Sequence, residues 1–399
     1  MPSIPKQAIE SLRKYQEQSG RRLGASPGRT EEEILELTLK RAAEREAQSI
    51  RKGEFICEGV FKYPARLEEL RWQRTREIIQ RVVPGRGEDP IYLEMIARQA
   101  ASLEITLCRQ HTDSPNPKAL ALCDRILIGT TVDLTPKAFE TFAGEDHFVV
   151  LLSYGFISFL YQAAKSTVLS WRPMTPPPGG SVSFGLKPED INRVIEKNPY
   201  ALGLLYKTIS TYLFKGSPRA IGYDPPPAMY HPPLSLLTNC VERFVIAHEY
   251  GHALFEQLRS IAALPPDPTS WQEEFGADSF ALFITLESAG VLDSIPPNVA
   301  LQGAFFALAG FEVLRKALDI VRSGEVQEDA GSETHPPTLQ RIAVLKELYL
   351  KHAIGGGSEP MAIKGALAPS ESLELLWNRI QQRFLKVHHA GKKLHPIWR

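Results

Sequence analysis

The chain has 399 residues, of which 43% are hydrophobic, and it carries 46 basic and 46 acidic side chains. This length suggests two or three domains, and the zero formal net charge excludes the basic excess of a general nucleic-acid binder. The cysteines, Cys57, Cys108, Cys123 and Cys240, are scattered without a Cys-x-x-Cys pair. This spacing predicts neither a cysteine zinc site nor a disulfide framework, and a reducing compartment is expected.

Residues 1 to 115 are predicted to form a charged, helical N-terminal region. Helices are expected over Glu31 to Lys52, Leu67 to Val83 and Pro90 to Ile105, where apolar residues recur at helical spacing. The start, Met1 to Lys6, lacks the apolar core of a secretory signal. The region could dock on a catalytic domain or recruit a partner, or its helices could simply pack on a core.

A strand followed by a helix is predicted next. Phe148 to Leu152 is a short apolar run that suits a buried strand, and Phe156 to Val168 is expected to form a helix. Ile126 to Ile128 is a candidate for a neighbouring strand. The residues alone are consistent with an internal strand that has no role in a cleft.

The stretch from Phe148 to Ala164 was also tested as a membrane span. Its length of about 17 residues is at the lower limit for crossing a bilayer, and Gly155 and several polar side chains weaken it. The predicted helix from Val299 to Val321 is interrupted by charged residues such as Glu312. We therefore expect no membrane span and a cytoplasmic protein.

Two proline clusters, Pro173 to Gly180 and Asp224 to Pro233, flank a helical insert. The first cluster cannot continue a helix and is expected to be an exposed loop. Helices are predicted around Ile191 to Glu196 and Leu204 to Phe214. Because loops near a cleft often carry specificity, the insert at 171–235 is a candidate for shaping or covering a substrate pocket.

The pentapeptide His-Glu-Tyr-Gly-His at 248–252 lies in the segment from Val241 to Leu258, which is apolar nearly all round and is expected to form a buried helix. On a helix, His248 and His252 share one face, so both imidazoles can reach one metal ion, while Glu249 points beside it. Buried polar groups of this kind are costly unless they are paired or bound to metal. The alternative is a helix with hydrogen-bonded core histidines, but the spacing favours a zinc site for metal-assisted hydrolysis.

The acidic segment that follows, Glu273 to Ala281, is expected to belong to a second buried helix. Glu274 and Asp278 are four residues apart and share a face, so Glu274 can be the third metal ligand while Asp278 accepts the outer N–H of a ligand histidine. Glu273 lies about 100° away around the helix and is expected to be solvated or to support a ligand. The alternative is a helix start with favourable acidic residues.

These motifs resemble known zinc peptidases. The His-Glu-x-x-His motif with Glu274 and Asp278 downstream is similar to the gluzincin metallopeptidases, in which two histidines and a later glutamate bind zinc. Thr-His-Pro-Pro at 334–337 followed by Arg341 resembles an element of the family of CAAX prenyl endopeptidases and HtpX-type quality-control peptidases. The segment from Arg243 to Glu249 is similar to the ImmA/IrrE-type peptidases, although that group usually has Asn in place of Asp278.

The resemblance covers roughly residues 120 to 348 and implies a zincin-like domain, in which the strand-then-helix unit forms the upper edge of the substrate cleft. We therefore expect an α+β, mainly helical fold. A helical N-terminal region at 1–115 would be followed by a zincin-like metallopeptidase domain at 116–348 and by a C-terminal helix with a basic tail at 349–399. The tail, from Val387 to His395, is expected to be a flexible, solvated terminus.

The expected function is zinc-dependent hydrolysis of peptide bonds in a cytoplasmic protein. Zinc held by His248, His252 and Glu274 would activate water and polarise the scissile carbonyl. Glu249 would take the water proton and deliver it to the leaving amine. His335 is expected either to stabilise the tetrahedral intermediate or to be part of a helix cap.

The expected partner is a protein or peptide substrate, with no nucleic acid, and the sequence leaves the oligomeric state open. A second function class is a non-catalytic zinc-binding sensor or regulatory protein on the same scaffold. The intact Glu249 favours the enzyme, because a purely structural site needs no general base. Structural zinc sites also tend to have four protein ligands, and only three are identifiable here.

Overall fold

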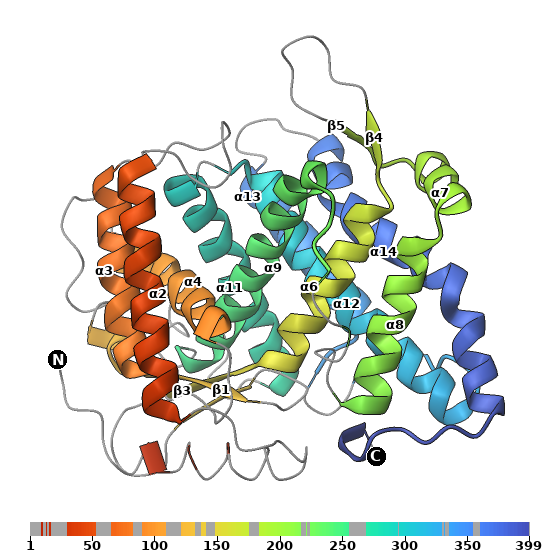
Figure 1. The fold of residues 1–399 in the computed structure, drawn as a ribbon, viewed down its shortest axis with the longest axis horizontal. Coiled ribbons are helices and arrows are strands. Elements are labelled where there is room, and N and C mark those ends of the chain that lie inside the picture. Colours follow the sequence, from red (N-terminus) through yellow and green to blue (C-terminus); the bar gives the residue numbers. More distant parts are fainter. Residues whose placement is uncertain are drawn as a thin grey trace. The chain divides into compact units, whose positions relative to one another are not determined.

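The computed structural model is mostly helical with two small sheets, which confirms the mainly helical α+β prediction (Figure 1). The structure describes residues 30–52, 65–82, 90–108, 121–131, 137–140, 148–174, 183–216, 224–254, 269–293, 295–328, 335–353 and 360–398, and the single residues 9, 10, 13, 16, 221 and 331.

The chain forms two compact units, and each is interrupted in sequence. The first unit combines Met1–Phe156 with Glu242–Pro297, and the second combines Ile157–Val241 with Asn298–Arg399. The predicted domain boundaries at 115/116 and 348/349 refer to domains that fold separately. The division into compact units does not test them, so they stay predictions.

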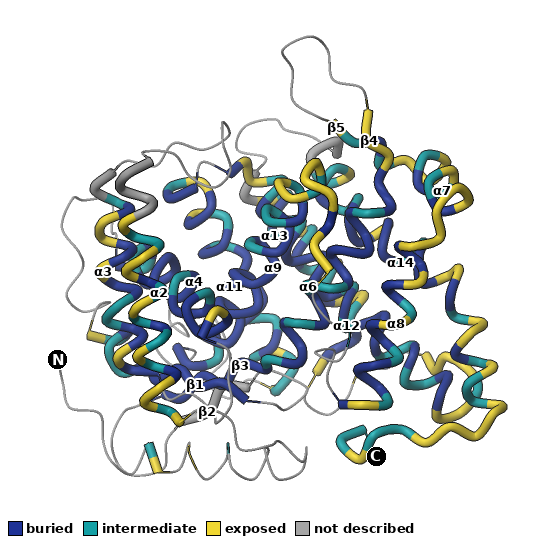
Figure 2. The backbone as a smooth tube through the Cα atoms, in the orientation of Figure 1, coloured by how far each residue is buried: buried dark blue, intermediate teal, exposed yellow. Residues whose placement is uncertain are grey.

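Helices α2 (Glu31–Lys52), α3 (Ala65–Arg81) and α4 (Pro90–Cys108) pack on one another in the first unit, as seen in red and orange in Figure 1. They confirm the three predicted N-terminal helices to within three residues at each end. α11 (Ser270–Asp293) packs on α4. Figure 2 shows that α4 is buried along most of its length, so it belongs to the core of this unit, whereas α11 has buried and partly exposed residues in turn.

A three-stranded sheet completes the first unit. Its strands are β1 (Ile126–Thr131), β2 (Lys137–Glu140) and β3 (Phe148–Ser153), in the order β1-β3-β2. β3 runs parallel to β1 and antiparallel to β2. Because β3 has a hydrogen-bonded neighbour on both sides, it is an internal strand and cannot accept a peptide strand. The possibility that β3 itself forms the edge of a cleft was therefore wrong.

Helix α6 (Tyr154–Leu169) begins directly after β3, where the Ser153 hydroxyl accepts a hydrogen bond of 3.0 Å from the backbone N–H of Phe156. The tested stretch from Phe148 to Ala164 is thus part strand and part helix. By length and composition α11 is the single helix among the described residues that could cross a membrane, and half of its apolar window is buried in the structure. This helix was not among the predicted candidates, and a buried core helix meets the same criteria of length and composition.

The second unit contains a β-hairpin and several helices. Strand β4 (Arg172–Met174) pairs with β5 (Ser183–Gly185) in antiparallel fashion. The predicted helices of the insert and of residues 299–321 are confirmed as α7, α8 and α12. Besides α6 and the first part of α9 (His231–Ala253), the helical elements described in this unit are α7 (Pro188–Lys197), α8 (Tyr200–Lys215), η2 (Ala228–Tyr230), α12 (Pro297–Ser323), α13 (Thr338–Ala353), α14 (Pro360–His389) and η4 (Pro396–Trp398).

The residues after α14 contact α8, while Lys392 and Lys393 are exposed, as expected of a solvated tail. The flexibility of the terminus stays a prediction. The backbone N–H of His395 donates to the carbonyl oxygen of Leu213 at 2.9 Å. The indole N–H of Trp398 donates to the carbonyl oxygen of Tyr212, also at 2.9 Å, and the two rings meet edge to face with centroids 5.2 Å apart. Basic charge dominates the tail sequence, but Trp398 supplies both an apolar ring and a donor for the contact with α8.

Candidate metal centre

Helix α9 (His231–Ala253) carries both motif histidines, and its second half is buried, with no exposed surface on Ala247. The helix begins earlier than predicted, because Pro232 and Pro233 occupy its first turn, where a missing N–H breaks no hydrogen bond. It ends at Ala253, one residue before a turn at Leu254, and the rest of the predicted continuation, residues 255–258, lies outside the described residues.

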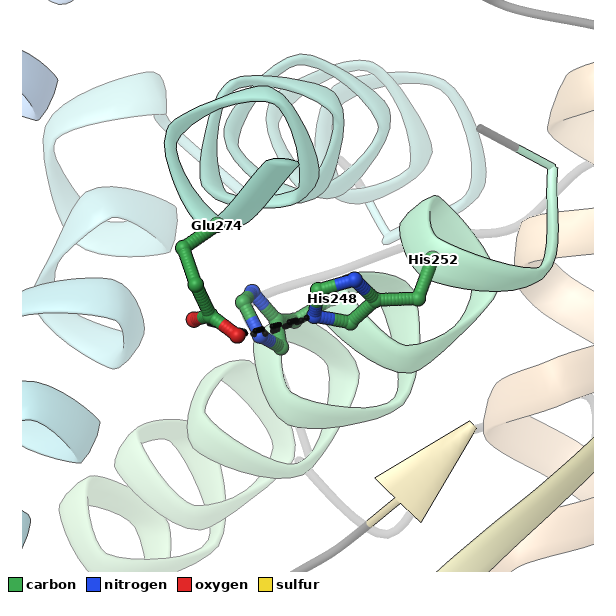
Figure 3. Close-up of side chains that lie close together, drawn as sticks. All are labelled: His248, His252 and Glu274. Atoms are coloured by element: carbon green, nitrogen blue, oxygen red, sulfur yellow. Dashed lines mark hydrogen bonds and ion pairs between the residues drawn. The ribbon is translucent and has the colours of Figure 1, made fainter. Parts of the chain in front are cut away.

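The structure brings His248, His252 and Glu274 together. The Nε2 atoms of the two histidines are 3.1 Å apart, and the Glu274 carboxylate lies 3.5 Å from Nε2 of His248 and 3.2 Å from Nε2 of His252. Figure 3 shows this carboxylate, which comes from α11, directed at the two imidazoles from α9. One ligand atom of each residue lies within 4.8 Å of the others, so the three form a possible metal-binding triad.

The distances are close to those around a zinc ion. Ligand atoms on a tetrahedron with bonds of 2.0–2.1 Å are about 3.3–3.4 Å apart. The two Nε2 atoms are 3.1 Å apart, and the Glu274 carboxylate approaches His252 with Oε1 at 3.2 Å and His248 with Oε2 at 3.5 Å. Two facing Nε2 atoms also need a proton or a cation between them, because both carry a lone pair when deprotonated. Two imidazole nitrogens and one carboxylate oxygen are donors that zinc accepts, and they leave a fourth position open.

Asp278 lies behind the triad. Its carboxylate is fully buried and lies 3.0 Å from Nδ1 of His248, so the ring is held with Nε2 towards Glu274. This is the arrangement in which a second carboxylate orients a ligand histidine and makes it more basic. Burial alone would lower the pKa of His248, but Asp278 and Glu274 together raise it to about 10. The site therefore stabilises a positive charge at this position.

Gly251 lets α9 and α11 approach closely. A Cβ atom at this position would lie 2.9 Å from Cα of Ala277 and 3.1 Å from its carbonyl oxygen, closer than real side chains pack. Glycine inside a helix costs about 0.5–1 kcal/mol relative to alanine. That cost is offset here by a helix contact that brings Glu274 within reach of His252. This role was not predicted, although a glycine between two histidines of a helical motif is a signal of close helix packing.

A buried network on the other elements fixes α9. Nε of Arg243 donates to Oε1 of Gln99 in α4 at 3.1 Å, and Nη2 of Arg243 donates to the carboxylate of Asp293 at the end of α11. Asp293 also accepts a hydrogen bond of 3.1 Å from Nη1 of Arg71 in α3. These contacts join the motif helix to α3, α4 and α11.

A second buried cluster centres on Glu104 of α4, which has 1% exposed surface. Its carboxylate lies 2.5 Å from Nε of Arg74 and 3.2 Å from Nη2 of Arg81, both in α3. The hydroxyl of Tyr250, inside the motif, donates to Oε1 of Glu104 at 2.8 Å. Burial raises the pKa of Tyr250 well above its usual value, so the hydroxyl stays protonated as a donor. No sequence pattern indicated this contact.

Two other acidic residues, Glu249 and Glu273, are next to members of the triad in the sequence. Glu249 follows His248 directly and is buried, with 5% exposed surface, and its role as general base stays a prediction. Glu273 is half-buried and is not part of the triad.

His335 and Arg341 belong to the second unit. His335 is exposed just before α13, and Arg341 is buried inside that helix. The backbone N–H groups of Gln340 and Arg341 donate to the carbonyl oxygen of Pro337, at 2.9 and 3.1 Å, so the Pro-Pro element starts the helix. This agrees with the helix-start alternative for the element. Thr334 lies outside the described residues, and a catalytic role for His335 stays a prediction.

Comparisons of the chain with family models, curated proteins and solved structures found no match. The resemblance to zinc peptidases therefore depends on the motif residues, and the assembled triad is the structural finding that bears on function.

Proposed function

We propose that this protein is a zinc-dependent metalloendopeptidase of the gluzincin type that hydrolyses peptide bonds of a cytoplasmic protein substrate. The observation that carries the proposal is the triad of His248, His252 and Glu274, whose spacing and donor atoms suit zinc. The placement of Asp278 on Nδ1 of His248 supports it, because ligand histidines in zinc enzymes are commonly oriented in this way. A zincin-like fold and the CAAX/HtpX-type resemblance are part of the same proposal.

The residues of the chain would divide the reaction among them. His248, His252 and Glu274 would hold the ion, and Asp278 would keep His248 in the orientation and tautomer that present Nε2. A zinc ion held there would supply Lewis acidity, which polarises a carbonyl group and lowers the pKa of water towards 7. Glu249 would accept the water proton and pass it to the nitrogen of the leaving amine. His335 would donate to the developing oxyanion, as the resemblance implies.

A second candidate is a zinc-binding sensor or regulatory protein without turnover. The limited exposure of the ligand side chains favours it, since 11% of His248, 23% of His252 and 7% of Glu274 is exposed. A site of this kind needs the ligands but not Glu249. The two candidates therefore differ at one residue that is not a ligand.

The test compares the wild type with Glu249→Gln. Glutamine keeps the size of the side chain but cannot accept the proton, so we expect about one zinc per chain in both proteins and a loss of hydrolysis of roughly 10²- to 10⁴-fold in the variant. Zinc and iron are measured by elemental analysis, because two histidines and a carboxylate also suit Fe(II). Cleavage is measured on casein and on a peptide library, with and without a chelator.

Glu273→Gln is the matched control, since Glu273 is the neighbour of a ligand but lies outside the triad. It should retain both zinc and activity. Equal chelator-sensitive cleavage by wild type and Glu249→Gln would show that Glu249 is not the base. Stoichiometric zinc without cleavage of any substrate by the wild type would favour the sensor.

A further inference from the structure

Cys108 and Cys123 form a thiol pair that the sequence does not reveal. Cys108 is the last residue of α4, and Cys123 lies just before β1. Both are free and buried, with 5% and 1% exposed surface, and their side chains share a hydrogen bond. They are 15 positions apart, far from the Cys-x-x-Cys spacing by which redox pairs are usually recognised.

Two arginines of α3 hold both sides of the pair. Nη1 of Arg81 donates to the carbonyl oxygen of Cys123 at 2.9 Å, and Arg74 forms an ion pair of 2.8 Å with the adjacent Asp124. The same arginines bind Glu104, which lies one helical turn before Cys108 in α4. The segments that carry the two cysteines are thus both anchored to helix α3.

The two thiols are not equivalent. The hydrogen bond from Cys123 lowers the pKa of Cys108 and outweighs the burial and the charge of Glu104, which act in the opposite direction. The pKa of Cys123 is raised well above 9, first by its hydrogen bond with Cys108 and then by burial. Cys108 also has the larger exposed surface. Cys108 is therefore the thiol that a small reagent reaches first.

We propose that Cys108 and Cys123 are a redox modification site, at which a small hydroperoxide converts the two thiols into a reversible disulfide. The Cys108 thiolate would attack one peroxide oxygen, so that an S–O bond forms, the O–O bond breaks and the leaving hydroxide is protonated to water. The Cys123 sulfur would then attack the Cys108 sulfenic acid, the S–S bond forms, and hydroxide leaves and takes the Cys123 proton as a second water. Two thiols are oxidised while one hydrogen peroxide is reduced, and a dithiol reductant reverses the change by exchange.

The full-length protein is reduced, treated with graded hydrogen peroxide, blocked with an alkylating reagent and mapped by mass spectrometry without reduction. We expect a peptide pair linked through Cys108 and Cys123 that disappears after treatment with dithiothreitol. Cys240 is the matched buried thiol, with 1% exposed surface. It should remain a thiol at peroxide concentrations that oxidise Cys108, with a rate at least about tenfold lower.

The variant Cys123→Ser separates the two steps. Without the second thiol, Cys108 should stop at the sulfenic acid, which a cyclic 1,3-dione reagent captures. The wild-type disulfide should also raise the melting temperature by about 5 °C, because it closes a short loop in the unfolded chain. A link from Cys108 to Cys57 or Cys240, no link at all, or equal oxidation of Cys108 and Cys240 would overturn the proposal. The mapping of the wild type decides it even where the variant does not fold.

Discussion

Two buried carboxylate clusters in the first unit differ in the groups that lie opposite the negative charge. Around Glu104 these are the guanidinium groups of Arg74 and Arg81, which are always charged. Around Glu274 and Asp278 they are imidazoles, at 3.0 to 3.5 Å, and an imidazole carries a charge only when it is protonated. The first cluster contains its own permanent positive charges, as expected of ion pairs that stabilise the fold. The second obtains its counter-charge by taking up a cation, either the proton held by His248 or a metal ion, as expected of a binding site.

The largest expected effect is on metal content. Removal of both imidazoles in His248→Ala/His252→Ala should weaken zinc binding on the order of 10⁴-fold or more. The binding free energy of a zinc site is about 10–16 kcal/mol and comes from few ligands, so the loss of two of them removes a large part of it. Zinc per chain is measured after dialysis against a weak chelator. His388→Ala/His389→Ala removes two histidines of α14 and should retain the metal. Full zinc content in the first double variant would show that the imidazole cluster is not the site.

The Glu104 cluster should respond in stability. Glu104→Ala leaves Arg74 and Arg81 without their buried partner and should cost about 3–5 kcal/mol of unfolding free energy. The control Glu77→Ala removes a carboxylate that also pairs with Arg74, at 2.7 Å, but is 26% exposed, and it should cost at most about 1 kcal/mol. Urea denaturation measures both. A similar loss of unfolding free energy in the two variants would show that the buried Glu104 cluster stabilises the protein no more than a partly exposed ion pair does.

Glu242 is a buried carboxyl of α9 outside both clusters, with 5% exposed surface. Burial raises its pKa to about 8, although Arg243 opposes this, so the folded protein holds a proton that the unfolded chain loses near pH 4.5. The stability of the wild type relative to Glu242→Gln should therefore be full below pH 4.5 and fall as the pH rises towards 8. By pH 7 the relative loss is at most about 3 kcal/mol. Urea denaturation at several pH values measures it, and a pH-independent difference would contradict the shift.

The smallest expected effect is at the residue behind the triad. Asp278→Ala leaves the three ligands in place but removes the carboxylate that orients His248, so zinc affinity should fall about 10- to 100-fold. Glu273→Ala, on the same helix but outside the triad, should bind zinc as the wild type does. Competition with a fluorescent chelator gives both affinities. Unchanged affinity in Asp278→Ala would mean that its distance of 3.0 Å from His248 has no consequence for the metal.

Local periodicity was enough to predict the helices and the residues that share a helical face. The spacing of His248 and His252, and that of Glu274 and Asp278, predicted two pairs that the structure places together across α9 and α11. The buried run at Phe148 was predicted as a strand for the same reason, because its pattern is contained in a few neighbouring residues.

Contacts between distant segments could not be predicted in this way. The Tyr250–Glu104 hydrogen bond joins residues 146 positions apart, and nothing in either local sequence indicates the other. β2 was missed because a strand of four residues with charged ends resembles a loop. The pair of Cys108 and Cys123 was not predicted for the same reason. Its geometry depends on how the end of α4 lies relative to the start of β1, and no spacing along the chain indicates this.

The close approach of α9 and α11 at Gly251 means that the geometry of the candidate metal centre depends on the distance between these two helices. A single methyl group in Gly251→Ala would meet the backbone of Ala277, so α11 would have to move away from α9 and carry Glu274 with it. All three residues of the triad would still be present, but the Glu274 carboxylate would lie farther from the two histidines. The identity of residue 251 thus sets how closely Glu274 can approach the two histidines.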